Sequence, residues 1–246
     1  MEPYFETDYG KCYYANCIDV LKSLPDNSCT LLFTSPPYNT GNKGKNKDMY
    51  TEYKDNLSDA DYYNLLSTVI QEGMRVCTYV FFNINYMNNN KKVLYKLLYE
   101  FSDSLRENII WKKDRVQPPI GNILGKRYEY IFLFTKDPKA EINTFRVNKA
   151  INYKAEFGNW LSNLVEVSLK TDQTEFAKTH RAGFPTALPK MFIDIYSKEN
   201  DVILDPFLGL GTTAIAAESL KRRWIGCELV QKYCDISLER LTNLKG

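Results

Sequence analysis

Several features that would point to a metal site, a secreted fold or a membrane protein are missing from this chain of 246 residues. It has one histidine, and none of its six cysteines forms a Cys-x-x-Cys pair or follows a proline. These absences argue against a zinc site, a disulfide framework and a Pro-Cys nucleophile loop, and they predict buried thiols in a reducing compartment. No apolar run could cross a membrane, and the polar, acidic residues 1–10 do not resemble a signal peptide. We therefore expect a cytoplasmic protein.

A strong net charge is also missing, since 32 Lys and Arg residues oppose 30 Asp and Glu residues and leave +2 at pH 7. This balance neither favours nor excludes nucleic acid, because a local basic face would be enough to bind it. The length fits one α/β domain with an insertion, which can bury a large core without disulfide or metal staples.

Apolar runs alternate with amphipathic segments along most of the chain. We expect strands over 11–16, 29–33, 77–84, 108–111, 128–134, 202–205 and 223–227. We expect helices over 17–24, 58–75, 87–101, 186–198, 212–220 and 231–244. This alternation predicts a mostly parallel sheet with both faces covered. No period persists between 137 and 178, which we interpret as an insertion, and the polar residues 40–56 predict a mobile loop.

A loop with two consecutive prolines, residues 34–39 (Thr-Ser-Pro-Pro-Tyr-Asn), follows the buried strand at 29–33. We call it the proline cup. The prolines fix φ and remove two backbone donors, so carbonyls in the loop can point at a ligand. Tyr38 offers a flat face beside them, and this combination suits a planar ring that carries an amino group. Considered alone, the motif is more typical of an ordinary turn after a strand.

A glycine turn joins the strand at 202–205 to the next helix. Gly209 and Gly211 allow the backbone to pass close to a ligand, and Glu228 could accept hydrogen bonds from two ribose hydroxyls. The pattern also fits a dinucleotide fingerprint, but too little chain follows Gly209 to build the second half of a dinucleotide fold. The missing strands would then come from the amino-terminal half. This predicts a permuted sheet order with the proline cup beside the glycine turn.

Together these motifs resemble the permuted β group of DNA amino-methyltransferases, which methylate cytosine N4 or adenine N6. The resemblance rests on the proline cup, on the run from Asp205 to Thr213, on the His-x-x-x-Phe-Pro element at 180–185, and on an opening element at 16–28. It implies an α/β, Rossmann-like class I methyltransferase sheet in circularly permuted order, with a small target-recognition insertion. Residues 1–136 would form the catalytic half, 137–178 the insertion, and 179–246 the half that binds the cofactor.

The resemblance implies S-adenosyl-L-methionine as the cofactor, S-adenosyl-L-homocysteine as its product, and no metal. The catalytic residues would be Ser35, Pro36, Pro37 and Tyr38, with the Ser35 hydroxyl and the Pro36 carbonyl accepting the amino protons and Tyr38 stacking on a flipped base. The cofactor-binding residues would be Asn16, Cys17, Thr34, His180, Phe184, Pro185, Asp205, Pro206, Phe207, Gly209, Gly211, Thr212, Thr213 and Glu228. Asn16 departs from the family pattern, which usually has Asp there, although Asn can also bond an adenine edge.

Double-stranded DNA is the partner that this resemblance implies. The family tendency for serine directly before the two prolines, the position of Ser35, favours cytosine N4 over adenine N6. The expected DNA contacts are Lys43, Lys45, Lys47, Lys112, Lys113, Arg115, Lys126 and Arg127, with solvated loop charges as the alternative. A homodimer and a cognate restriction endonuclease are further partners to consider. The alternative functions are an RNA or protein amide methyltransferase, a non-catalytic cofactor-binding module, and a dinucleotide oxidoreductase.

Overall fold

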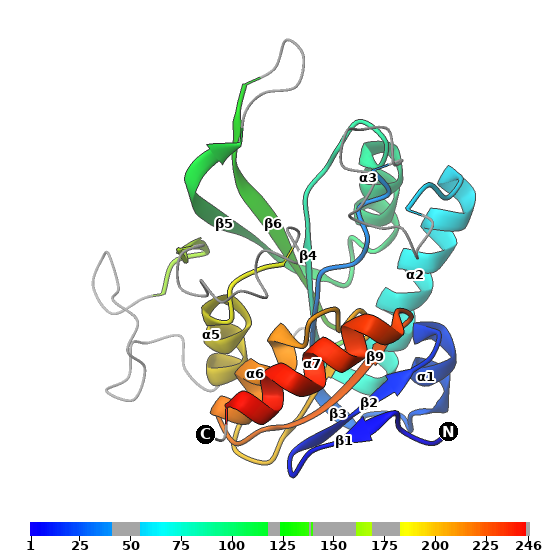
Figure 1. The fold of residues 1–246 in the computed structure, drawn as a ribbon. Helices are drawn as coiled ribbons and strands as arrows, with labels where there is room; N and C mark the ends of the chain where they lie inside the picture. The colour runs from blue at the N-terminus through cyan, green and yellow to red at the C-terminus, as the bar shows by residue number, and fades with distance from the viewer. Residues whose placement is uncertain (41–54, 118–123, 138, 140–160, 169–182, 245–246) are drawn as a thin grey trace.

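The computed structural model describes residues 1–40, 55–117, 124–137, 139, 161–168 and 183–244 (Figure 1). Their centre is a sheet of nine strands in the order β1-β2-β9-β8-β3-β4-β6-β5-β7. The strands are β1 (Phe5–Glu6), β2 (Gly10–Tyr14), β3 (Cys29–Thr34), β4 (Cys77–Ile84), β5 (Leu105–Gln117), β6 (Lys126–Phe134), β7 (Leu164–Glu166), β8 (Val202–Asp205) and β9 (Arg223–Glu228). The helices are α1 (Cys17–Ser23), α2 (Asp59–Val76), α3 (Lys91–Glu100), α5 (Ala187–Tyr196), α6 (Thr212–Ser219) and α7 (Gln231–Asn243).

The order of the strands confirms the permuted sheet. Strands β2, β9, β8, β3 and β4 are successive parallel neighbours, so β8 and β9 from the end of the chain lie between β2 and β3 from its beginning. Strand β6 then runs antiparallel to both β4 and β5. The mostly parallel part of the sheet therefore combines the two ends of the sequence.

Helices cover both faces of the sheet, as the sequence predicts (Figure 1). Apolar residues of α5, α6 and α7 pack in one core cluster, and those of α1, α2 and α3 pack in the other. Side chains alternate between these clusters along each strand. In β3, for example, Leu31 and Phe33 belong to the first cluster and Leu32 to the second.

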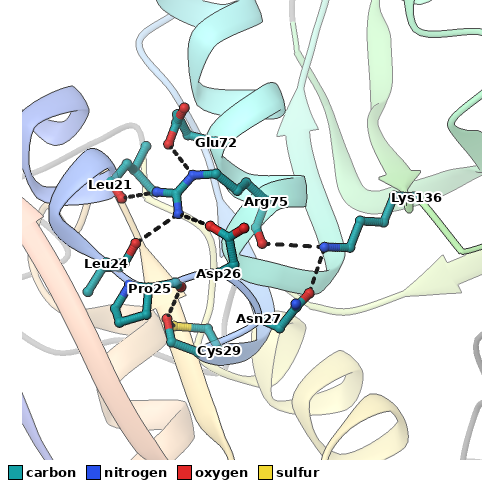
Figure 2. Close-up of polar contacts among 10 residues, drawn as sticks. Leu21, Leu24, Pro25, Asp26, Asn27, Cys29, Glu72, Arg75 and Lys136 are labelled. Carbon is teal, nitrogen blue, oxygen red and sulfur yellow. Dashed lines mark hydrogen bonds and ion pairs between the residues drawn. The ribbon is translucent and has the colours of Figure 1, made fainter.

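Arg75, in the last turn of α2, ties together the edge of the sheet at which β3 and β4 begin (Figure 2). Its guanidinium donates to the carbonyls of Leu21 and Leu24, each at 2.8 Å, and to the Asp26 carboxylate at 2.6 Å. The two carbonyls lie at the end of α1, where backbone donors are scarce and only Leu21 also accepts from Leu24 N, at 3.1 Å. Because this cluster holds the amino-terminal edge, the opposite edge of the sheet is available for a site.

Most predicted elements are confirmed, and β4 has the predicted bounds. Helix α3 begins later than expected, at Lys91, because Met87 and Asn90 form a turn in which the Asn90 side chain accepts from Met87 N at 2.6 Å. The terminal strand β1 was missed, since only Phe5 of its two residues is buried. All six cysteines are free and buried, as predicted.

The other differences concern β5 and β7. Strand β5 is much longer than the predicted 108–111, because its charged second half pairs with β6 in a hairpin. Strand β7 lies inside the predicted insertion 137–178 and pairs with β5, so part of this segment belongs to the sheet. No helix in the described ranges is long and apolar enough to span a membrane.

Candidate active site

The predicted motifs meet at the carboxyl-terminal edge of four adjacent parallel strands. Ala15 N, just after β2, donates to the Glu228 carbonyl at 3.1 Å, and Leu208 N donates to the Cys227 carbonyl at 2.9 Å. The Thr34 hydroxyl donates to the Asp205 carboxylate at 2.7 Å, which joins the proline cup to the glycine turn. The predicted neighbourhood of cup and glycine turn is therefore confirmed. In open α/β sheets, ligands bind at this edge.

Thr34 and Asp205 are both buried, with 0% and 3% exposure, and their hydrogen bond links residues 171 positions apart. Burial raises the pKa of Asp205 to about 6, and the hydrogen bonds from Thr34 and from Phe207 N oppose the rise. The Thr34–Asp205 hydrogen bond holds the two halves of the edge together, and the expected role of both residues as direct cofactor contacts stays a prediction.

The raised pKa predicts a pH dependence of stability. The folded protein binds the Asp205 proton more tightly than the unfolded chain, so this stabilisation is complete below about pH 4 and is lost as the pH rises through about 6. Asp205→Asn keeps an acceptor for Thr34 and carries no charge. We expect it to match the wild type near pH 4 and to exceed its unfolding free energy by up to about 3 kcal/mol at pH 7.5.

Urea denaturation of both proteins between pH 4 and 7.5 measures this difference. Asp103→Asn, at an exposed position, controls for the loss of a carboxylate. A gap between wild type and Asp205→Asn that does not change with pH would rule out the titration of Asp205 as its cause.

The two glycines of the turn adopt left-handed backbone conformations, with φ of +53° at Gly209 and +76° at Gly211. A Cβ on Gly211 would lie 2.2 Å from Ser237 Oγ in α7, so this glycine is needed for helix packing. A Cβ on Gly209 would have no atom closer than the Phe207 carbonyl oxygen at 3.9 Å. Gly209 therefore leaves room for a ligand to approach the backbone, whereas Gly211 serves the fold.

Glu228, at the end of β9, faces the glycine turn. Its Oε2 accepts from Gly209 N at 2.9 Å, and its Oε1 accepts from Leu229 N at 2.9 Å and Val230 N at 3.0 Å. Burial raises its pKa, and these backbone bonds oppose the rise. A carboxylate can accept about four hydrogen bonds, so Glu228 keeps capacity for a ribose hydroxyl.

The proline cup is held from outside by two residues that the sequence did not single out. The Tyr62 hydroxyl of α2 donates to the Pro37 carbonyl at 2.7 Å, and the buried Asn90 amide donates to the Tyr38 carbonyl at 3.0 Å. Two cup carbonyls are thus used inside the protein. The acceptors that remain as candidates for a substrate are Ser35 and Pro36.

A buried carboxylate fastens the end of the cup. Asn39 has a left-handed backbone conformation, with a φ of +55°. Its backbone N donates to the Asp55 carboxylate at 2.7 Å. The backbone N and hydroxyl of Thr40 donate to the same carboxylate, at 2.9 and 2.5 Å. Asp55 and Leu57 thereby hold Asn39 and Thr40 in place. The sequence did not predict this role of Asp55, because one carboxylate among many polar residues forms no recognisable motif.

The Tyr38 side chain ends at a buried ion pair. Its hydroxyl donates to Glu129 Oε2 at 2.9 Å, and Glu129 Oε1 pairs with the ammonium of Lys113. The Lys113 and Glu129 side chains are 8% and 10% exposed. The assignment of Lys113 to the DNA contacts is therefore corrected, because its charge is buried and neutralised. Tyr38 is half-buried, and its hydroxyl also accepts from Ser35 Oγ at 3.4 Å.

The other described basic residues of the prediction lie on the β5–β6 hairpin, which extends past the end of β4 (Figure 1). Arg115 and Arg127 are exposed, and Lys112 forms an exposed ion pair with Glu166. Lys126 donates to the Tyr86 carbonyl and lies 4.5 Å from the centre of the Tyr86 ring. Lys43, Lys45, Lys47 and His180 lie outside the described residues.

The remaining predicted cofactor residues also lie around this edge. Asn16 Oδ1 accepts from Ile18 N at 2.9 Å and caps α1, and Cys17 is buried in the first turn of that helix. Phe184 packs edge-on against Phe33, with ring centres 5.3 Å apart. Pro185 is buried just before α5, and its carbonyl accepts from Leu188 N at 2.9 Å. The other members occupy the glycine turn and the start of α6: Pro206, Phe207, Thr212 and Thr213. Within the described ranges, no group of three His, Cys, Asp or Glu residues is placed to hold a metal ion.

Comparison with known proteins decides the family. A sequence model of the N6/N4 methyltransferases, described as DNA methylase, matches residues 29–239, which is most of the chain. The chain belongs to this DNA methylase family. Like its relatives, it is an enzyme that methylates exocyclic amino groups in DNA, and the cofactor of the family is S-adenosylmethionine.

Individual relatives agree with this assignment. The chain is 31% identical over 239 residues to type II methyltransferase M.HpaI of Haemophilus parainfluenzae, covering 92% of this chain and 72% of the relative. Its fold is similar to that of PvuII DNA methyltransferase (cytosine-N4-specific), with a TM-score of 0.74 and 22% identity over 98% and 93% of the two chains. It is also similar to TTHA0409 of Thermus thermophilus, complexed with S-adenosylmethionine, with a TM-score of 0.61 and 22% identity over 96% and 95%.

The residues at the edge of the sheet fit this cofactor. A partly exposed carboxylate at Glu228 suits ribose hydroxyls, and the open side of Gly209 allows close approach of a ligand to the backbone. The proline cup adjoins this position through the Thr34–Asp205 bond, so a cofactor at the glycine turn and a base in the cup would be neighbours.

Proposed function

We propose that this DNA methylase transfers a methyl group to N4 of a cytosine that is flipped out of double-stranded DNA. The observation that carries the proposal is Ser35, which stands directly before the two prolines of the cup and next to Thr34, the residue that joins the cup to Asp205. The similarity in fold to a cytosine-N4-specific enzyme supports the same choice. Adenine N6 is the alternative target within the family.

The chain's own residues would hold the target amino group. Its nitrogen is a poor nucleophile because the lone pair is delocalised into the ring. We propose that Ser35 Oγ and the Pro36 carbonyl accept its two protons and favour a more tetrahedral nitrogen. S-adenosylmethionine, when bound, supplies an activated methyl group on a sulfonium. Most of the catalytic effect would then come from positioning and from oriented dipoles.

DNA contacts are proposed from the exposed hairpin cations Lys112, Arg115 and Arg127, together with Lys126. The hairpin extends past the sheet on the side of the site, where a duplex would have to lie for its base to reach the cup. Residues 137–178 are proposed to recognise the target sequence. A cognate restriction endonuclease fits the type II relative, and a homodimer and a cytoplasmic location remain predictions.

One experiment tests the reaction and the base together. The protein is incubated with methyl-labelled S-adenosylmethionine and unmethylated genomic DNA, and the digested nucleosides are separated by chromatography. We expect the label in N4-methyl-deoxycytidine. Label in N6-methyl-deoxyadenosine would reject the cytosine assignment while keeping the reaction class. Absence of label from DNA, with label in RNA or protein substrates offered in parallel, would reject the proposed function.

A further inference from the structure

We propose that Glu129 is a positioning residue that acts through the Tyr38 hydroxyl and makes Ser35 Oγ an acceptor for the amino group of the target base. The inference rests on the proposed function, because it concerns how the same cup selects its substrate. It holds for cytosine N4 and adenine N6 alike, since both are exocyclic amino groups.

A chain of hydrogen bonds leads from the cup into the protein. Ser35 Oγ donates to the Tyr38 hydroxyl at 3.4 Å, and that hydroxyl donates to Glu129 Oε2 at 2.9 Å. The other carboxylate oxygen of Glu129 pairs with Lys113. Tyr38 and Glu129 are 91 residues apart in sequence, and Glu129 extends from the part of β6 that runs past the end of β4.

The direction of these bonds follows from counting protons. An ionised carboxylate can only accept, so Glu129 requires Tyr38 to donate its single proton. The Tyr38 oxygen can then only accept from Ser35. With its own proton directed at Tyr38, Ser35 Oγ presents lone pairs to whatever enters the cup.

Two features keep this direction from reversing. Lys113 supplies a buried positive charge beside Glu129, which favours the ionised carboxylate in a site where an unpaired charge would be costly. The Lys113 ammonium also lies 4.9 Å from the ring centre of Trp111, whose indole N donates to the Val167 carbonyl at 3.0 Å. Burial, with the charge of Glu129 beside it, holds the pKa of Tyr38 well above its usual range, so the phenol keeps its proton.

The consequence is selectivity for amino groups. Cytosine and adenine present N–H donors at the reacting position, whereas thymine presents a carbonyl oxygen. A cup whose serine can only accept binds the first two and repels the third. A neutral residue at position 129 could donate to Tyr38, and the Ser35 proton could then turn toward the substrate.

Two substitutions test the chain at separate links. Tyr38→Phe keeps the ring and the ion pair and removes only the hydroxyl, and Glu129→Gln replaces the obligate acceptor by a group that can donate. We expect each to lower kcat about 10-fold or more, because the lost orientation acts on the reacting group. The Kd for S-adenosylmethionine and the KM for DNA should stay within about threefold of wild type, since neither substitution changes the glycine turn or the hairpin cations proposed to hold the duplex. The double variant should lose little more than either single variant, because both break one chain.

A matched control lies on α2 and α3, where the Tyr63 hydroxyl donates to Glu100, which also pairs with Lys96. Tyr63→Phe and Glu100→Gln remove the same chemical contact away from the site and should leave kcat unchanged. If Glu129→Gln does not fold, Tyr38→Phe still decides the question, because it leaves the buried pair intact.

The inference is overturned if Tyr38→Phe retains the wild-type kcat. It is also overturned if the fold-decrease in kcat of the double variant equals the product of the two single fold-decreases, as expected for independent changes. Failure of the proposed function has a different outcome, namely a wild-type protein that leaves DNA unlabelled.

Discussion

Replacing Gly211 by alanine is expected to lower the free energy of unfolding by about 3 kcal/mol, through a strained backbone and an overpacked helix contact. Gly211 has a φ of +76°, which disfavours any residue with a Cβ. The new Cβ would lie 2.2 Å from Oγ and 3.1 Å from Cβ of Ser237, which is fully buried in α7. Thermal unfolding should show a fall in Tm of about 6 to 12 °C.

Gly209→Ala is the matched control for this effect. Its φ of +53° imposes a similar backbone cost, but its nearest neighbouring atom would be 3.9 Å away. We expect it to cost about 1 kcal/mol. Adding Ser237→Ala to Gly211→Ala should recover part of the loss, because the closest clashing atom is removed. Equal destabilisation by the two glycine substitutions would show that helix packing against Ser237 contributes nothing.

Replacing Glu228 by alanine is expected to weaken S-adenosylmethionine binding about 30-fold, as one hydrogen bond from a ribose hydroxyl to a charged acceptor would account for about 2 kcal/mol. The substitution also removes the acceptor of Gly209 N, Leu229 N and Val230 N, which shape the turn. Isothermal titration calorimetry with the cofactor measures the change. The same titration with NAD distinguishes a methyltransferase site from a dinucleotide site.

Two further variants separate cofactor binding from folding. Glu228→Gln keeps one acceptor oxygen for the backbone and should weaken the cofactor by an intermediate factor. Glu199→Gln removes a carboxylate whose side chain is 61% exposed and should bind the cofactor as the wild type does. A folded Glu228→Ala protein with unchanged cofactor affinity would contradict the placement of the ribose at this strand end.

The fold was accessible from the sequence because its signals are local. Apolar periodicity located β3, β4, β8 and β9 closely, since buried parallel strands are short apolar runs between polar turns. The permuted order was predicted from the position of the glycine turn after the proline cup, and the strand order confirms it. The hairpin part of β5 was missed because residues 112–117 are mostly charged and show no alternation of apolar and polar side chains. Strand β7 was missed because three residues carry too little pattern.

The site was accessible only in part. The prolines of the cup and the two glycines of the turn could be recognised from the sequence, because few other residues can adopt their backbone conformations. The residues that hold the cup are ordinary polar side chains. Their roles come from burial beside the cup, as for Asn90, Asp55 and Glu129. The type of a residue does not reveal whether it will be buried.

The sequence by itself determined the family, the permuted α/β order and the two motifs that face each other across the site. It could do so because these depend on conformational limits and periodicities that act over a few residues. The tertiary structure alone decided that Lys113 neutralises Glu129 instead of contacting DNA, that Thr34 and Asp205 join the two halves, and that the hydrogen bonds run from Ser35 toward Glu129. These facts depend on which side chains meet across tens to hundreds of residues, and on how much water the fold excludes around them.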